Sequence, residues 1–189
     1  MKHSERGRRI LSIKEIAVFS MLGTVMFLGD ILFEMLPNIH FVGVLAAVYT
    51  MVYRKKALIP IYIYILLNGF YAGFSLWWIP YLYIWIPLWG MVMLIPRGLH
   101  VAWTAVLCSA ACTLHGIAFG TLYAPAQAIM FGLKLDSMIA WIIAGLPFDM
   151  IHGAGNFVGS VIVIPLTALL CKLEHLPLPY RTLKKHDCR

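Results

Sequence analysis

Residues 145–170, GLPFDMIHGAGNFVGSVIVIPLTALL, place an aspartate, a histidine and an asparagine at the start of an otherwise apolar run. Asp149, His152 and Asn156 are spaced i, i+3 and i+7, and these positions share one face of a helix. An ionisable group inside a membrane is costly and therefore marks a candidate functional site. The same groups could instead bond to neighbouring helices and lock a bundle together, because buried polar groups need partners whatever their role.

The composition of the whole chain is that of an integral membrane protein. Its 189 residues are 61% hydrophobic and 12% charged, and the mean hydropathy is +0.84, whereas a soluble domain is about 45–50% apolar and about 25% charged. A spanning helix needs roughly 20 apolar residues. Six spans are predicted, over residues 13–36, 41–53, 58–74, 79–95, 99–119 and 138–171. The last segment is too long for one straight span and is expected to tilt or project.

The basic residues predict the orientation of these spans. Cytoplasmic loops carry an excess of Lys and Arg, and with six spans every one of the 15 Lys and Arg residues except Lys134 falls on the side of the two termini. We therefore expect an all-α polytopic protein with cytoplasmic N- and C-termini. Residues 1–175 are predicted to form a single six-helix domain and 176–189 a short basic cytoplasmic tail. The same distribution argues against a nucleic-acid groove.

The three connections on the other side are rich in aromatic and amide residues: LPNIHF (36–41), SLWWIPYLY (75–83) and GTLYAPAQAIMFGLKLDS (120–137). An interfacial aromatic belt accounts for some of the aromatic residues. Tyr81, Trp85 and Trp89 continue one helical face, however, and Trp89 lies deeper than a belt residue should. We expect this face to be a stacking wall for a flat, ring-containing ligand.

Other features set limits on the chemistry. Asp30 and Glu34 form an acidic i, i+4 pair near the outer end of the first span, and Asp30 is deep enough to need a partner. The sequence contains no GxxxxGK[ST], GxSxG or HExxH motif. It therefore lacks the motifs of common nucleotide-binding, hydrolase and zinc-protease sites. The cysteines form no CxxC pair, and small buried side chains are the simpler interpretation.

The last span looks like the P-F-D-x-x-H-x-x-x-N run of substrate-binding S components of energy-coupling factor (ECF) vitamin transporters. Residues 36–57, LPNIHFVGVLAAVYTMVYRKKA, also look like their first outer loop and second span. The resemblance extends over nearly the whole chain through the order of these motifs and the six-span pattern. It implies a subunit in a prokaryotic cell membrane that captures a vitamin or related micronutrient at the outer face.

The resemblance also implies partners and a ligand site. Such a subunit docks on a transmembrane coupling subunit driven by two ATPase subunits, so it is not expected to be an enzyme or to hold a cofactor or metal. The family places its ligand in the outer half of the bundle. On this sequence that site corresponds to His40, Trp77, Trp78, Tyr81, Trp85, Trp89, Tyr123, Gln127, Asp149, His152 and Asn156.

The docking stripe departs from the family pattern. S components often carry Ala-x-x-x-Ala in the first span, whereas here Ala17 is followed by Met21. A face of small residues survives, and it is the predicted docking surface: Ala17, Ser20, Gly23 and Thr24.

Two functions of other classes remain open from the sequence. One is an intramembrane enzyme that uses Asp149 and His152 as an acid–base pair. The other is a stand-alone small-solute transporter with Asp30 or Asp149 as its proton carrier. The substrate is equally open among riboflavin, thiamine, pyridoxine, folate, cobalamin and queuosine-type bases.

Overall fold

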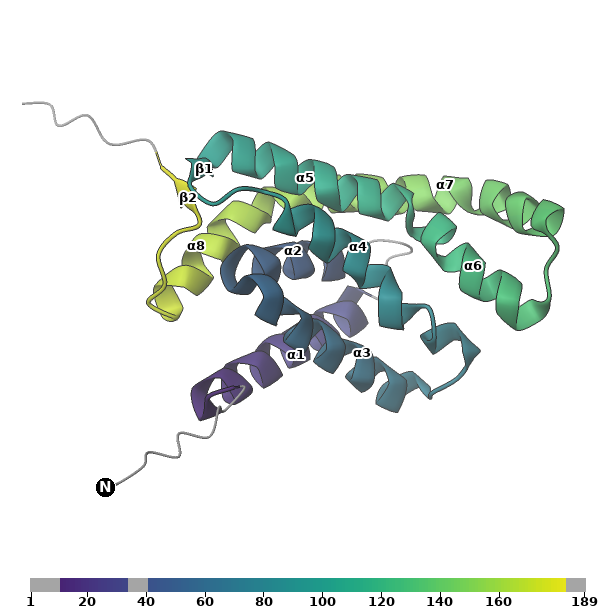
Figure 1. The fold of residues 1–189 in the computed structure, drawn as a ribbon, viewed down its shortest axis with the longest axis horizontal. Helices are drawn as coiled ribbons and strands as arrows, with labels where there is room; N and C mark the ends of the chain where they lie inside the picture. The colour runs from purple at the N-terminus through teal and green to yellow at the C-terminus, as the bar shows by residue number, and fades with distance from the viewer. Residues whose placement is uncertain (1–10, 34–40, 183–189) are drawn as a thin grey trace, which may run out of the picture.

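The computed structural model describes residues 11–33 and 41–182 and is mostly helical, at 83%. Its α-helices are α1 (Ile13–Phe33), α2 (Val42–Tyr53), α3 (Leu58–Ala72), α4 (Tyr81–Met93), α5 (Val101–Ile117), α6 (Phe119–Phe131), α7 (Leu135–Gly159) and α8 (Val163–Leu173). Short 3-10 turns lie at Arg54–Ala57, Leu76–Trp78 and Ser160–Ile162. Figure 1 shows the paired α5 and α7 along one side of the molecule and α1 and α3 on the other, with α2 and α4 between them.

Four helical stretches in the described part of the chain are long and apolar enough to cross a membrane: Ile13–Phe33, Leu76–Met93, Val101–Phe131 and Leu135–Leu173. They fit the integral membrane protein expected from the composition. The predicted second and third spans form α2 and α3, of 12 and 15 residues. At 1.5 Å per residue these helices measure only ~18 and ~22 Å, against a hydrocarbon core of ~30 Å. The six-span arrangement therefore stays a prediction.

Helix α2 forms the centre of the core. All of its residues except Leu45 and Tyr53 are buried, and it packs against α1, α4, α5 and α8. A helix that is hydrophobic on all sides is expected in this central position. The small residues Gly43, Ala46 and Ala47 allow neighbouring helices to approach closely.

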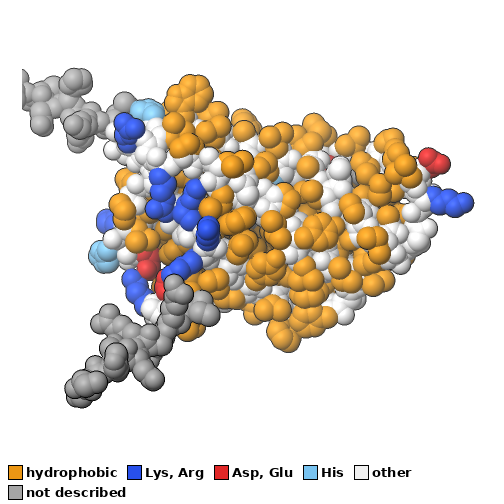
Figure 2. Space-filling model, in the orientation of Figure 1, with side chains coloured by type: hydrophobic (Ala, Val, Ile, Leu, Met, Phe, Trp, Pro, Cys, Tyr) orange, Lys and Arg blue, Asp and Glu red, His pale blue; other side chains and the backbone are white. Residues whose placement is uncertain are grey.

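Charged side chains gather at the ends of the molecule, and apolar side chains cover its flanks. In Figure 2 the Lys and Arg side chains cluster at the end that holds the start of α1 and the end of α8. We call this the basic end; its described members are Lys14, Arg54, Lys55, Lys56, Arg97, Lys172 and Arg181. At the opposite end, Lys134 directly precedes α7 and Asp136 lies in the first turn of that helix. The separation of Lys134 from the basic end in the structure agrees with the separation of the basic residues along the sequence.

Segment 120–137, expected to be a loop, is largely helical. Residues Phe119–Phe131 form α6, with Pro125 inside the helix, and α6 packs along α7. Gly and Pro are loop signals in a sequence, but the apolar face of this segment is covered by α7 and buries Ala124 and Ala126. Tertiary packing therefore overrides the local signals.

The last predicted span divides in two instead of projecting as one long helix. α7 begins at Leu135, outside the predicted boundary, and a 3-10 turn at Ser160–Ile162 separates it from α8. In Figure 1 the chain changes direction between α7 and α8.

The segment after α8 folds back onto the basic end. Tyr180–Arg181 forms β2, which pairs in parallel with β1 (Leu99–His100). The Tyr180 side chain is buried, and its hydroxyl donates a hydrogen bond to the Ile164 carbonyl at 3.2 Å. The first part of the predicted tail is thus attached to the bundle.

Candidate functional site

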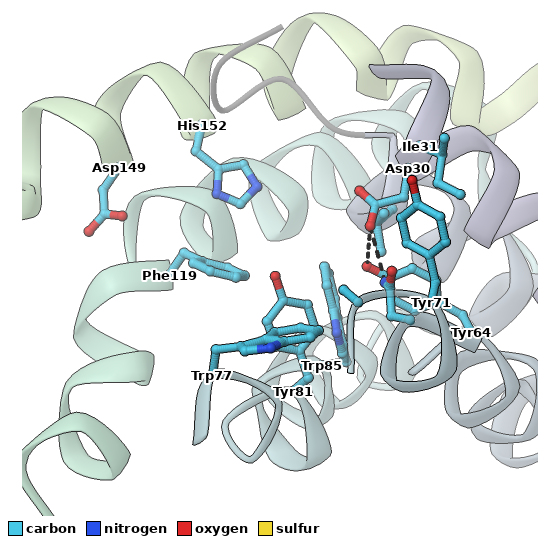
Figure 3. Close-up of a pocket in the computed structure, with 13 residues that line it drawn as sticks. Asp30, Ile31, Tyr64, Tyr71, Trp77, Tyr81, Trp85, Phe119, Asp149 and His152 are labelled. Carbon is cyan, nitrogen blue, oxygen red and sulfur yellow. Dashed lines mark hydrogen bonds between the residues drawn. The ribbon is translucent and has the colours of Figure 1, made fainter. Parts of the chain in front are cut away.

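A cavity of about 390 Å³ lies between α1, α2, α3, α4, α6 and α7, beside the 3-10 turn Leu76–Trp78. This volume falls within the range of about 300–1,000 Å³ that is usual for small-molecule sites, so the cavity can hold a small ring system. Figure 3 shows its aromatic floor and the polar groups around it. The lining residues are Asp30, Ile31, Val42, Tyr64, Asn68, Tyr71, Ala72, Trp77, Tyr81, Trp85, Phe119, Asp149 and His152.

The cavity lies in the half of the bundle remote from the basic end. Asp30 is 16 residues beyond Lys14 on α1, which corresponds to ~24 Å along the helix axis. On α3, Tyr71 lies near the end that leads to Trp77, whereas the helix starts beside Arg54–Ala57. The site therefore faces the side that the basic residues predict to be the outer one.

Aromatic rings pack edge to face around the cavity. The ring centroids of Trp77 and Tyr81 are 5.6 Å apart with an interplanar angle of 84°, and those of Tyr81 and Trp85 are 6.4 Å apart at 63°. Phe119 completes the wall, 6.1 Å from Trp85 and 4.9 Å from the His152 ring. Edge-to-face contacts stabilise each ring in a fixed orientation, so the neighbouring rings keep the shape of the cavity wall fixed.

Asp30 has partners on α3. The Tyr64 hydroxyl donates to its Oδ2 at 2.8 Å, and the Asn68 amide donates to the same oxygen at 3.2 Å. Both bonds are visible in Figure 3. The partner expected for Asp30 thus exists, and α1 and α3 are joined at the cavity wall. Its companion Glu34 lies outside the described residues.

Asp149 both lines the cavity and caps a helix. Its Oδ1 and Oδ2 accept hydrogen bonds from the Gly120 N–H at 3.0 and 3.1 Å. Gly120 lies in the first turn of α6, where a carboxylate is stabilised by unpaired N–H groups and by the helix dipole. A Cβ at position 120 would lie 2.4 Å from Asp149 Oδ2. Only glycine fits there without movement of the carboxylate.

The three polar residues of α7 are all buried, but they do not share one environment. Asp149 and His152 line the cavity. Asn156 lies one turn farther along, 1% exposed, between α2 and α5. A Cβ at Gly43 would be 3.2 Å from Asn156 Oδ1, and one at Gly116 would be 2.8 Å from Nδ2. Neither amide atom has a hydrogen-bond partner among the described residues, so Asn156 acts there as a packing element between two close helices.

Trp78 and Trp89, two of the predicted aromatic ligand contacts, do not line this cavity. Trp78 donates its indole N–H to the Ile65 carbonyl at 2.8 Å. Trp89 donates to the Arg54 carbonyl at 3.2 Å, near the basic end. It lies eight residues beyond Tyr81, or ~12 Å along α4, which takes it past the cavity.

The predicted ligand contacts from segment 120–137, and the one from segment 36–41, are not among the described residues that line the cavity. Tyr123 donates its hydroxyl to the Trp77 carbonyl at 2.9 Å and stacks with Trp141, so it supports the wall from behind. Gln127 is half-buried on α6 and His40 lies outside the described residues. Of the predicted site, the structure brings together Trp77, Tyr81, Trp85, Asp149 and His152.

The sequence interpretation missed the contribution of α3. Tyr64, Asn68 and Tyr71 line the cavity, and they are spaced i, i+4 and i+7. This is the criterion that singled out the polar face of α7, and it would have found these three residues in span 58–74. No sequence pattern marked Phe119 as a cavity residue, because its position depends on the break between α5 and α6.

The predicted docking stripe on α1 is only partly exposed. Ala17, Ser20 and Thr24 face outward, while Gly23 is buried against α3. A Cβ at Gly23 would lie 2.6 Å from Ile63 Cγ2 and 3.0 Å from the Pro60 carbonyl oxygen. Gly23 therefore serves the contact between α1 and α3.

Comparisons with protein-family models, with curated proteins and with solved structures found no significant match to this chain. Within residues 11–33 and 41–182, no group of three or more His, Cys, Asp or Glu side chains could hold a metal ion. The arrangement that the described residues do offer is a preformed cavity with aromatic walls and a few fixed polar groups, which is typical of small-molecule binding sites.

Proposed function

We propose that this protein is the substrate-capture subunit, or S component, of an ECF-type importer for a vitamin or related micronutrient. The observation that carries the proposal is the cavity itself. It combines aromatic walls with polar groups from several helices, and it lies remote from the basic end. In this proposal six segments cross a prokaryotic cell membrane, both termini are cytoplasmic, and the cavity opens toward the outer face.

The energy for uptake comes from partners in this proposal. The subunit docks on a transmembrane coupling subunit that is driven by two ATPases. The outward face of α1, with Ala17, Ser20 and Thr24, is the proposed contact, because small residues allow close approach of another helix. Gly23 is left out of this surface because α3 covers it.

The size of the cavity narrows the candidate substrates. About 390 Å³ suits one ring or two fused rings with short substituents. Cobalamin is several times larger than such a ring system and is the least suitable of the candidates. A small heteroaromatic vitamin or base is the preferred substrate.

Two experiments separate this function from its rivals. Gentle purification of the tagged protein from its native membrane should recover a coupling subunit and two ATPases, and mass spectrometry of the sample should identify the bound ligand. Purified protein alone in liposomes should bind this ligand without accumulating it. Sustained accumulation driven by a proton gradient would show a stand-alone transporter, with Asp30 or Asp149 as the candidate carrier. Conversion of the ligand to a product would show an intramembrane enzyme.

A further inference from the structure

Two arginines lie at the basic end where β1 and β2 pair. Arg97 is separated from β1 only by Gly98, and Arg181 is the last residue of β2. Arg181 Nε donates a hydrogen bond to the Gly98 carbonyl at 2.5 Å, and the Gly98 N–H donates to the Pro179 carbonyl at 2.7 Å. The residue that follows Arg97 is therefore in direct contact with the Arg181 guanidinium.

Most of the donors on these two side chains are not used. Arg97 Nη2 donates to the Val52 carbonyl at 3.1 Å, and the Arg181 guanidinium bonds to Gly98. A guanidinium carries five N–H donors in a planar fork that matches carboxylate and phosphate groups. Within residues 11–33 and 41–182, neither arginine forms an ion pair with a carboxylate. Both side chains thus keep N–H groups for an anion that comes from outside the described chain.

Positive charge is in excess at this end of the molecule. The seven described Lys and Arg side chains of the basic end face two described carboxylates, Glu15 and Glu174. Glu15 is paired with Lys56, and Glu174 with Lys14 at 2.9 Å. Neither carboxylate is thus left to pair with the arginines.

Arg54 and Arg97 each cap the helix that precedes the other. Arg54 donates to three carbonyls around the end of α4, and Arg97 donates to the Val52 carbonyl near the end of α2. The negative ends of the two helix dipoles offset part of the positive charge. Burial and the neighbouring Arg97 charge nevertheless lower the pKa of Arg54, so the two like charges still repel each other. A bound anion would relieve this repulsion.

Exposed apolar side chains adjoin the arginines. Leu94 and Leu178, each three residues before an arginine, are 83% and 44% exposed. Trp103, in the first turn of α5 beyond β1, is 63% exposed, and tryptophan is enriched at the level of the lipid headgroups. Figure 2 shows apolar side chains bordering the Lys and Arg cluster. A soluble anion would meet only the charges, whereas a phospholipid offers a phosphate and acyl chains together, so the combination favours a lipid.

We propose that Arg97 and Arg181 bind the phosphate of an anionic phospholipid whose acyl chains lie against Leu94, Leu178 and the apolar flank of the bundle. The guanidinium forks hold the phosphate oxygens, and the excess positive charge favours an anionic headgroup over a zwitterionic one. This lipid site does not depend on the capture function. It requires only that the basic end lie at a membrane surface.

Lipids that differ only in their headgroup test the site. Phosphatidylglycerol and phosphatidylcholine with the same acyl chains are titrated into the purified full chain in detergent, and bound lipid is counted by native mass spectrometry. We expect phosphatidylglycerol to bind at least about tenfold more tightly, because each basic residue near an anionic lipid contributes about fivefold. Equal binding of the two lipids overturns the proposal.

Free phosphate distinguishes a lipid from a soluble anion. Inorganic phosphate and glycerol 3-phosphate carry the charge of the headgroup without the acyl chains, so neither should displace phosphatidylglycerol at an equal concentration. Displacement by either of them would show a site for a soluble anion and would overturn the lipid assignment.

Arg97→Gln and Arg181→Gln should each lower the affinity for phosphatidylglycerol about fivefold and leave phosphatidylcholine nearly unchanged. Lys134→Gln removes a positive charge from the opposite end, and Lys55→Gln removes an exposed one from the basic end. Both controls should preserve the preference for the anionic lipid. A loss in Lys55→Gln as large as that in Arg181→Gln would show a diffuse effect of net charge and would overturn the site.

The competing occupant is an acidic surface of a partner protein. In the isolated wild-type chain, phosphatidylglycerol should slow the modification of Arg97 and Arg181 by phenylglyoxal, read by peptide mass spectrometry, and phosphatidylcholine should not. Protection that requires a bound partner protein, with none from the lipid, overturns the lipid site and assigns the surface to that partner. The capture function is unaffected by either result.

Discussion

The contact between α5 and α7 determines the position of the polar residues of α7, and Gly116→Ala tests it. A Cβ on Gly116 would lie 2.8 Å from the Gly153 Cα, 2.9 Å from the Gly153 nitrogen and 2.8 Å from Asn156 Nδ2. Two of these atoms are backbone, so a side-chain rotation cannot relieve the overlap. The two helices must separate by several tenths of an ångström.

The expected cost follows from two opposing effects. Overpacking of a tight contact costs about 1–3 kcal/mol, and replacement of glycine by alanine inside a helix returns about 0.5–1 kcal/mol. The net destabilisation should be about 0–2.5 kcal/mol, which lowers the midpoint of thermal unfolding by up to roughly 10 °C for a chain of this size. Gly90→Ala is the matched control, because a Cβ at Gly90, inside α4, would meet nothing within 4 Å. It should stabilise the protein by up to about 1 kcal/mol.

The assay is thermal unfolding of the wild type and the two variants in one detergent, followed by tryptophan fluorescence. The expected order of stability is Gly90→Ala, wild type, Gly116→Ala. If Gly116→Ala unfolds at or above the temperature of Gly90→Ala, α5 and α7 are not in backbone contact, and the placement of Asn156 between them is wrong.

Three further predictions concern the site, the basic end and the topology. Asp149→Asn keeps an acceptor for the Gly120 N–H but removes the charge at the start of α6, so the free energy of unfolding should fall by about 0.3–2 kcal/mol. Because Asp149 also lines the cavity, the affinity for the ligand should fall as well. Normal ligand binding by the folded variant would show that Asp149 only caps α6. Arg54 donates hydrogen bonds to the Val92, Met93 and Ile95 carbonyls at the end of α4, so Arg54→Ala should cost about 1.5–3 kcal/mol of unfolding free energy, and a loss no larger than that of the exposed control Lys55→Ala would contradict this role. On a cysteine-free background, a cysteine at position 55 should react with an impermeant reagent only after permeabilisation and one at position 136 without it; the reverse pattern would invert the proposed topology.

Much of the fold could be predicted from the sequence, because composition and helical periodicity are local properties. The positions of α1, α2, α3, α4 and α5 follow the predicted apolar segments closely, since each runs between polar or Gly- and Pro-rich breaks. The separation of charged residues into two ends was also predictable, because basic residues are spaced along the chain by whole spans. Helix α6 was not, because its stability depends on the packing of α7 and on capping by Asp149.

The candidate site, like the fold, was predictable only where it depends on spacing within one segment. The sequence by itself determined that Asp149 and His152 share a face of one helix, and that Trp77, Tyr81 and Trp85 lie together near the start of another, because these relations depend on spacing within a single segment. Only the tertiary structure decided that Asp30, Tyr64 and Asn68 meet across α1 and α3, that Trp89 lies past the cavity, and that Asn156 packs between Gly43 and Gly116. Helical periodicity sets the direction of a side chain around its own axis. The distance between helices, and therefore which side chains share a cavity, depends on how small residues and rings from several segments pack against one another.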